Sequence, residues 1–368
     1  MNKKLTSQNI ESLYHGSIFL GSGGGGKPDT LLSVLKSSVN KNEKIPLIPP
    51  TEVPDDSTVA AVGIIGSPEL LNEDIPTGDE GIRALRLLEQ ILEKKIDFLV
   101  SPEGAGVNIL YPLLVSTKAG IPLIDGDGMG RAFPELQMTT FHIYGEIPGA
   151  PMVLCDSRGD EKIFYSMDNF LLEIDTRQAL NEYGGAGYFA GFAMTGREAK
   201  TAIVPDTISF CEKLGEVFSE TSSYQKILKD IINVTKNSIY GSAIELFIGF
   251  VEGMGNVRTF KLRTINLRGT REYNQEEFKI LIQNENLFAY RNNKVAAMVP
   301  DLICLLDYQS GIPLNNNDLT PGMEVAVIGI PAPTLLKTKK ALNVVGPQCF
   351  NYKSGYQPLE AIHFSYYF

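Results

Sequence analysis

Acidic side chains and glycines gather in two short stretches of the first 140 residues, 102–108 (PEGAGVN) and 125–135 (DGDGMGRAFPE). Asp125 and Asp127 are spaced i, i+2, so on a strand they share one face, and in a glycine-rich loop they can converge on one point. A carboxylate placed there can take a proton from water as a general base. We expect Asp125 or Asp127 to be the catalytic base, with Glu103 as the alternative.

A third stretch, Gly21–Gly26 (GSGGGG), lies between the apolar segment SIFL and a helical stripe at 29–39. We expect a strand or turn, then the loop, then a helix, an arrangement whose amides and helix dipole cradle anions. The glycines satisfy GxGxxG, but Pro28 stands where a phosphate-binding loop needs a magnesium-binding hydroxyl. Three uses stay open: nucleotide binding, close backbone packing, and the binding of a small polar substrate or its developing negative charge.

A divalent metal is another use for the acids. Its ligands would be Glu103, Asp125 and Asp127, with His142 helping, or Glu135 in place of one of the acids. The chain has only three histidines, and its four cysteines lie far apart without a CxxC pair. Any metal site must therefore use mostly oxygen ligands, and no other cofactor is predicted.

Three β-rich apolar segments, at 58–65, 96–101 and 121–124, alternate with helical patterns at 79–94 and 107–119. This alternation predicts βαβ units and a parallel sheet. In such sheets ligands bind beyond the carboxyl ends of the strands, and each predicted strand here is followed by small residues. The substrate-binding residues predicted at this edge and in the glycine loop are Gly23, Gly24, Gly25, Gly26, Ser67, Gly106, Asn108, Arg131 and Glu135.

The chain of 368 residues is long enough for two domains. We predict an α/β domain with a mostly parallel sheet at 1–165. A largely β (α+β) domain, sandwich or barrel-like, is predicted at 166–368, with a helix at 207–229 and short alternating apolar runs from Phe247 onward. Exposed strand edges in the second half make a homo-oligomer plausible.

The overall composition excludes several classes of protein. With 43 acidic and 33 basic residues, the net charge of −10 argues against a protein that mainly binds nucleic acid or an anionic membrane. No apolar run approaches the ~18–20 residues of a membrane span, and no secretory signal is apparent at the start. We expect a cytoplasmic protein with a small-molecule substrate.

Several longer motifs resemble one known family. They are LGSGGGG (20–26), GSP (66–68), PEGAGVN (102–108), IPLIDGDGMGRAFPELQMTTF (121–141), QNENL (283–287), VPDLI (299–303), VGPQCF (345–350) and YQPLE (356–360). Together they resemble the DUF917 family of S-methyl thiohydantoin desulfurase-like proteins, often found beside hydantoin-utilisation enzymes. Two positions depart from the family pattern. Gly104 and Ala105 replace isoleucine and glycine, and Asn351 stands where glycine is usual.

The resemblance implies a hydrolase-type enzyme acting on a small cyclic amide or thiohydantoin, in which water adds to a ring carbon and a thiol or amide nitrogen leaves. Amides of the 23–26 loop and the 104–106 turn would stabilise developing negative charge. Asn108 and Arg131 would orient polar ring atoms, although Arg131 can instead pair with Glu135 at i, i+4. The alternatives are a non-catalytic ligand-binding subunit of a hydantoinase-type complex and a nucleotide-dependent enzyme.

Overall fold

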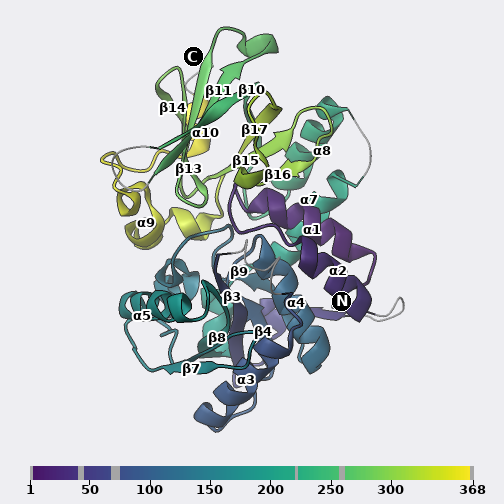
Figure 1. Cartoon of the computed structure of the whole chain (residues 1–368), viewed down its shortest axis with the longest axis vertical. Helices are drawn as coiled ribbons and strands as arrows, with labels where there is room; N and C mark the ends of the chain where they lie inside the picture. The colour runs from purple at the N-terminus through teal and green to yellow at the C-terminus, as the bar shows by residue number, and fades with distance from the viewer. Residues whose placement is uncertain (1–2, 40–44, 68–74, 220–222, 257–261, 365–368) are drawn as a thin grey trace.

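The computed structural model describes residues 3–39, 45–67, 75–219, 223–256 and 262–364, so Pro68 of the GSP motif lies outside the described residues. The chain forms two sheet-based layers, one above the other in Figure 1. Among the helices of these ranges, none is long and apolar enough to cross a membrane.

The first sheet has nine strands and a parallel centre. The central parallel strands are, in spatial order, β2 (Ile45–Ile48), β5 (Leu123–Asp127), β4 (Phe98–Ser101) and β3 (Thr58–Gly66). The antiparallel strands around them are β1 (Lys3–Leu5), β8 (Ala186–Thr195), β6 (Met152–Cys155), β7 (Glu161–Phe164) and β9 (Val204–Pro205). The α/β prediction is confirmed, as a mixed sheet whose centre is parallel.

The predicted helices and strands of this domain occur close to their expected positions. The crossover helices are α3 (Asp79–Leu92) and α4 (Val107–Ala119), and α2 (Asp29–Ser38) follows the glycine loop. Ala84, Leu85 and Leu88 of α3 are buried at the spacing of one helix face. Helix α4 ends at Gly120, whose positive φ of 69° suits a helix C-cap.

One local prediction is wrong. The apolar segment SIFL before the glycine loop is not a strand or turn but the end of α1 (Asn9–Leu20). Its residues Ile18, Phe19 and Leu20 are all buried, since α1 lies against both α7 (Thr207–Val217) and strands of the second sheet. A short apolar run buried on all sides has no periodicity to separate helix from strand.

The chain returns to the first sheet after residue 165. Helix α5 (Asn169–Glu182) leads into β8, which pairs with β3, and α6 (Gly196–Ala202) leads into β9, which pairs with β5. The first sheet is therefore complete only at β9. The helix predicted at 207–229 is observed as α7 and α8 (Tyr224–Lys236), with 220–222 outside the described residues.

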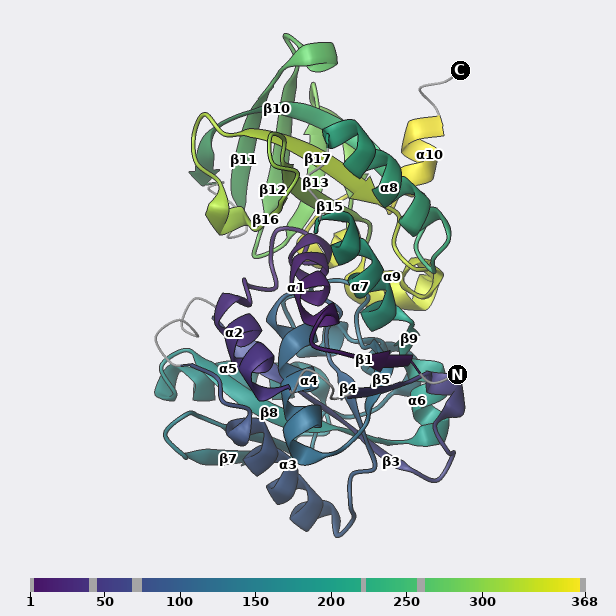
Figure 2. The same ribbon diagram turned by 90° about the vertical axis from the view of Figure 1, so that its right-hand side faces the viewer.

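The second domain is built on one antiparallel sheet of eight strands. They are β10 (Ile244–Asn256), β11 (Arg263–Gly269), β12 (Glu277–Ile282), β13 (Asn286–Arg291), β14 (Lys294–Met298), β15 (Leu302–Asp307), β16 (Pro313–Leu314) and β17 (Glu324–Ile330). Strand β13 lies against β15 although four strands separate them in the hydrogen-bonding order, so the sheet is strongly curled (Figure 2). Helices α9 (Lys339–Val345) and α10 (Leu359–Phe364) complete this largely β domain.

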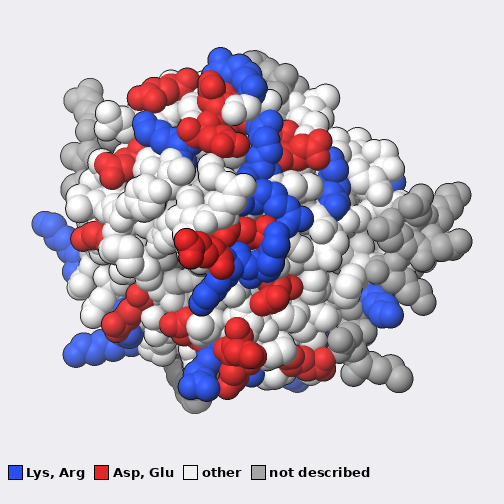
Figure 3. Space-filling model, turned by 90° about the horizontal axis from the view of Figure 1, so that it is seen from below, with Lys and Arg blue, Asp and Glu red and all other residues white. Residues whose placement is uncertain are grey.

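The face at the lower end of the molecule carries charges of both signs. Figure 3 shows a band of Lys and Arg side chains with Asp and Glu side chains on both sides of it. A broad uncharged area lies beside the band, on the side where α5 lies in Figure 1.

Candidate functional site

A cavity of about 340 Å³ lies where the two domains meet, beyond the carboxyl ends of the central parallel strands. Both halves of the chain line it, and the second half contributes the loop after β12 and the asparagines after β16. The predicted site residues that line it are Gly23, Gly24, Gly25, Gly26, Ser67, Glu103, Asn108 and Glu135. The strand-end argument therefore located a real cavity, as open α/β sheets lead one to expect.

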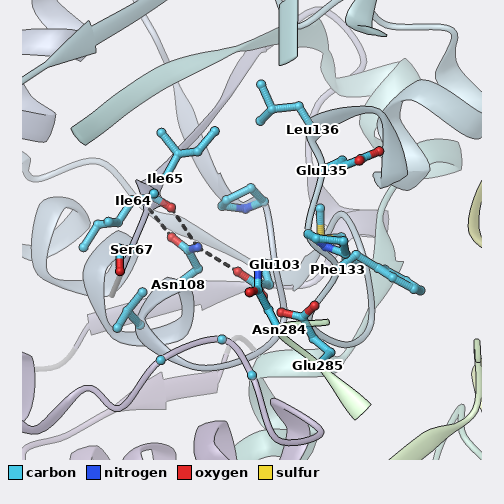
Figure 4. Close-up of a pocket in the computed structure, with 18 of the residues that line it drawn as sticks. Ile64, Ile65, Ser67, Glu103, Asn108, Phe133, Glu135, Leu136, Asn284 and Glu285 are labelled. Carbon is cyan, nitrogen blue, oxygen red and sulfur yellow. Dashed lines mark hydrogen bonds between the residues drawn. The ribbon is translucent and has the colours of Figure 1, made fainter. Parts of the chain in front are cut away.

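Glu103 follows β4 and is held by Asn108 in the first turn of α4. The Asn108 Nδ2 donates to Glu103 Oε2 at 2.8 Å and to the Ile64 carbonyl at 3.1 Å, while its Oδ1 accepts from the Ile64 amide at 2.8 Å. Asn108 thus ties the catalytic candidate to the end of β3 (Figure 4). Burial, together with the negative charges of Glu285 and Asp127, raises the pKa of Glu103 to about 8.

Glu285 is a second acid in the same cavity, and sequence reasoning missed it. It lies in the loop between β12 and β13, and Figure 4 shows its carboxyl group beside that of Glu103. Burial raises the pKa of Glu285, against the opposing effects of the Arg131 charge and the Gly25 amide. The only signal in the sequence was the motif QNENL, which supported the family resemblance without suggesting a role.

The glycine loop joins the two domains. Its carbonyl groups accept four hydrogen bonds: Ser22 from the Asn286 amide at 2.7 Å, Gly23 from the Asn316 amide at 3.0 Å, Gly24 from Asn315 Nδ2 at 3.1 Å and Gly25 from the Val107 amide at 2.9 Å. A Cβ on Gly24 would lie 2.5 Å from Glu285 Oε1. Close packing thus accounts for glycine at this position.

Two amides of this loop already have partners. The Gly24 N–H donates to the Gly21 carbonyl at 2.9 Å, and the Gly25 amide bonds the Glu285 carboxyl group. An anion would therefore have to compete with a carboxylate for the Gly25 amide. Gly106 does not line the cavity but packs behind the loop, where its amide donates to the Ser17 carbonyl at 3.0 Å.

Asp127 lies under the cavity rather than in its lining. Its Oδ1 accepts from the amides of Met129 and Gly130, the latter at 2.6 Å, so it closes the turn that follows β5. Gly104 passes directly over it, because a Cβ there would lie 2.4 Å from Asp127 Oδ2. Burial raises the pKa of Asp127 to about 6, and its charge acts on Glu103 from below.

Asp125 is not brought to the cavity either. Its Oδ1 accepts from the Ser209 amide at 2.9 Å, and its Oδ2 accepts from the Ser209 hydroxyl group. Both oxygens are thus committed to the first turn of α7. The i, i+2 spacing was expected to make the two aspartates converge, but each carboxylate serves a different loop, so of the three predicted acids only Glu103 lines the cavity.

Arg131 is completely buried and holds the second domain. Its Nη1 donates to the carbonyls of Pro300 and Asp301 at 3.2 and 2.7 Å, and its Nη2 donates to the Asn286 carbonyl at 3.0 Å. The guanidinium group therefore neither reaches the cavity lining nor pairs with Glu135. It influences the site by its charge, which opposes the rise in the pKa of both glutamates.

The proposed metal ligands lie in different places. His142 Nδ1 is 3.1 Å from Asn169 Nδ2 beside α5, away from the glutamates, while Asp125 and Asp127 bind their own loops. Within the described ranges, no group of three or more His, Cys, Asp or Glu side chains is arranged to hold a metal ion. These residues therefore do not fit a shared metal centre.

Comparisons with known proteins agree with this two-domain arrangement. A family model described as the S-Me-THD-like N-terminal domain matches residues 8–166, and one described as the S-Me-THD-like C-terminal domain matches residues 167–359. The chain belongs to the S-Me-THD-like family. The resemblance drawn from the motifs is confirmed. The cavity of this family member is lined by residues from both matched regions.

A solved structure supports the fold. The crystal structure of a protein from Chromobacterium violaceum is similar over 97% of this chain and 99% of that chain, with a TM-score of 0.81 and 22% sequence identity. At that identity the likeness concerns the fold alone. No curated protein matched the chain.

Proposed function

We propose that this member of the S-Me-THD-like family is a hydrolase-type enzyme that acts on a small cyclic amide such as a hydantoin or S-alkyl thiohydantoin. Glu103 and Glu285 are its acid–base pair. The observation that carries the proposal is that these two carboxyl groups, one from each domain, line one cavity and that the pKa of each is raised. Titratable groups perturbed in this way are concentrated at catalytic sites.

The two glutamates can divide the acid and base roles between them. Negative charge on Glu285 is one reason why the pKa of Glu103 reaches about 8, so at neutral pH the proton resides mainly on Glu103. Two interacting carboxyl groups lose their protons in separate steps, and one stays protonated while the other is ionised. We assign Glu285 as the base and Glu103 as the acid.

The reaction then follows from these protonation states. Glu285 takes a proton from water as the water oxygen bonds to the sp² ring carbon. Glu103 gives its proton to the leaving sulfur as the C–S bond breaks, which releases a thiol and leaves a ring carbonyl. Exchange with solvent returns the proton from Glu285 to Glu103. With a hydantoin, the ring nitrogen leaves in place of the sulfur.

The cavity suits a small ring. A volume of about 340 Å³ is at the lower end of the range for ligand pockets. Ile64, Ile65 and Phe189 supply apolar walls, while Asn108 and Asn284 supply amide groups beside the two acids. A flat heterocycle has both apolar faces and polar edge atoms, which match these two kinds of wall.

The charge in the cavity disfavours the nucleotide alternative. Glu103 and Glu285 lie beside the glycine loop, so a polyphosphate placed there would meet at least one carboxylate. We therefore expect no thermal stabilisation by millimolar ATP or NAD. The four cysteines are free, which supports a cytoplasmic location for the enzyme.

The proposal is tested by incubating the pure protein with hydantoins, thiohydantoins and S-methyl thiohydantoins and measuring substrate loss and thiol release. Glu103→Gln and Glu285→Gln should each lower turnover by about 10²-fold or more. The matched control is Glu272→Gln, which changes an exposed carboxyl group in the second domain. Binding of these compounds without turnover would support the ligand-binding subunit instead, and absence of both would overturn the proposal.

A further inference from the structure

An apolar surface lies on α5, on the opposite side of that helix from the protein core. Five large apolar side chains within ten residues are each more than half exposed: Tyr165 (64%), Met167 (67%), Phe170 (52%), Leu171 (54%) and Ile174 (61%). We call them the α5 patch. They are five of the nine exposed large hydrophobic residues in the described ranges, and a concentration of this kind marks interaction sites.

The α5 patch is a fixed surface rather than a frayed helix end. Asp168 caps the helix, its carboxylate accepting from the amides of Phe170 and Leu171 at 2.8 and 3.3 Å. The next residue, Asn169, accepts from the Gly149 amide at 2.6 Å and donates to the Ile147 carbonyl at 3.0 Å. These bonds fix the start of α5, so the patch does not have to become ordered when a partner binds.

The patch continues directly from a sheet edge. Strand β7 ends at Phe164, one residue before Tyr165, and it is the last strand of the first sheet in the hydrogen-bonding order. An edge strand can pair antiparallel with its own copy around a two-fold axis. A helix face beside that edge would meet the same face of the copy, so the surface is self-complementary.

We propose that a second copy of this chain docks on the α5 patch and the adjoining edge of β7, forming a two-fold symmetric dimer. Five side chains more than half exposed present on the order of 500 Å² of apolar surface. A standard interface buries ~800 Å² per partner, so the patch and the strand edge together approach the area of a stable dimer. Exposed acids (Asp168, Asp175) and the Lys162–Glu182 ion pair around the patch do not favour a partner of one charge.

The dimer would also support the cavity. Glu173 of α5 accepts from the Leu136 amide at 3.0 Å, and Arg177 of the same helix donates to the Pro134 carbonyl at 2.6 Å. Pro134 and Leu136 both line the cavity. A partner that holds α5 therefore fixes one cavity wall, whatever the ligand of that cavity is.

Sedimentation equilibrium of the full chain between 1 and about 100 µM tests the proposal. We expect twice the 40.4 kDa chain mass for the wild type. Ile174→Lys and Met167→Lys should each weaken dimerisation by at least about 30-fold, since each buries a charge at the centre of the interface. The matched control is Ile312→Lys, which changes an equally large apolar residue, 46% exposed, in the second domain.

Circular dichroism of each variant separates loss of the dimer from loss of the fold. Met167 precedes α5, so Met167→Lys provides a test that does not alter the helix. A wild type of 40.4 kDa at the highest concentration would overturn the proposal. So would a dimer that persists in both patch variants, or one that only Ile312→Lys dissociates.

Discussion

Glu103 and Glu285 belong to different domains, yet the negative charge of Glu285 raises the pKa of Glu103 across the cavity that they share. Neither domain alone can produce this effect. Asn108 positions the first acid, and the glycine loop contacts the second. The acid–base pair therefore depends on how the two sheets are joined.

Removing the charge of Glu285 should lower the pKa of Glu103. In Glu285→Gln the repulsion between two carboxylates is lost, so ionisation of Glu103 becomes easier and its pKa moves from about 8 towards the ordinary value for glutamate. NMR titration of ¹³C-labelled glutamate carboxyl groups measures this shift, with Glu103→Gln assigning the signal. Glu272→Gln should leave the titration unchanged. A pKa that stays fixed or rises in Glu285→Gln would contradict the shared cavity.

The stability contributed by protonated Glu103 should depend on pH in a defined window. The folded state holds this proton up to about pH 8 and the unfolded state only up to about pH 4.5, so the contribution is complete below pH 4.5 and is lost as pH rises to 8. The loss amounts to at most about 5 kcal/mol.

Denaturant unfolding at pH 5 and pH 8, for the wild type and Glu103→Gln, measures this contribution. The variant mimics the protonated acid, so the wild type should lose stability relative to it as pH rises. The comparison is needed because burial lowers the pKa of His15, His142 and His363, which makes folding more favourable as pH rises. A constant difference between the two proteins would show that Glu103 is ionised at both pH values.

Loss of Arg131 should destabilise the whole protein rather than weaken substrate binding alone. Arg131→Met leaves buried carbonyl groups of Pro300, Asp301 and Asn286 without their donor, at a cost of about 3–5 kcal/mol. Urea unfolding measures this change. Arg197→Met is the control, because its ion pair is exposed and contributes less than about 1 kcal/mol. A drop in activity with unchanged stability would place Arg131 in substrate binding instead.

Gly106→Ala should be much more damaging than another glycine substitution of similar backbone geometry. Both Gly106 (φ 54°) and Gly120 (φ 69°) have positive φ, so alanine is strained at either position by about 1–2 kcal/mol. A Cβ on Gly106 would lie 1.8 Å from the Gly25 carbonyl oxygen, whereas one on Gly120 meets nothing within 4 Å. Thermal unfolding of the two variants therefore isolates the packing cost. Equal losses of stability would mean that the loop can move away.

The location of the site could be predicted from the sequence, but the orientation of its side chains could not. Strands followed by small residues and acids placed Glu103 and Asn108 at the correct edge of the sheet. The same pattern could not show that Asp125 turns to Ser209 or that Arg131 reaches carbonyls of the second domain. A carboxylate or guanidinium group points to whichever buried partners the fold supplies, and those partners are remote in sequence.

Local periodicity and turn residues in the sequence determined the α/β first domain, the β-rich second domain and the helices α3 and α4. These features depend on neighbouring residues, which any chain reading can see. Only the tertiary structure decided that Glu285 completes the site, that the glycine loop joins two domains, and that β8 returns to the first sheet. These relationships arise from contacts between distant segments, because burial and desolvation depend on what the folded chain brings together.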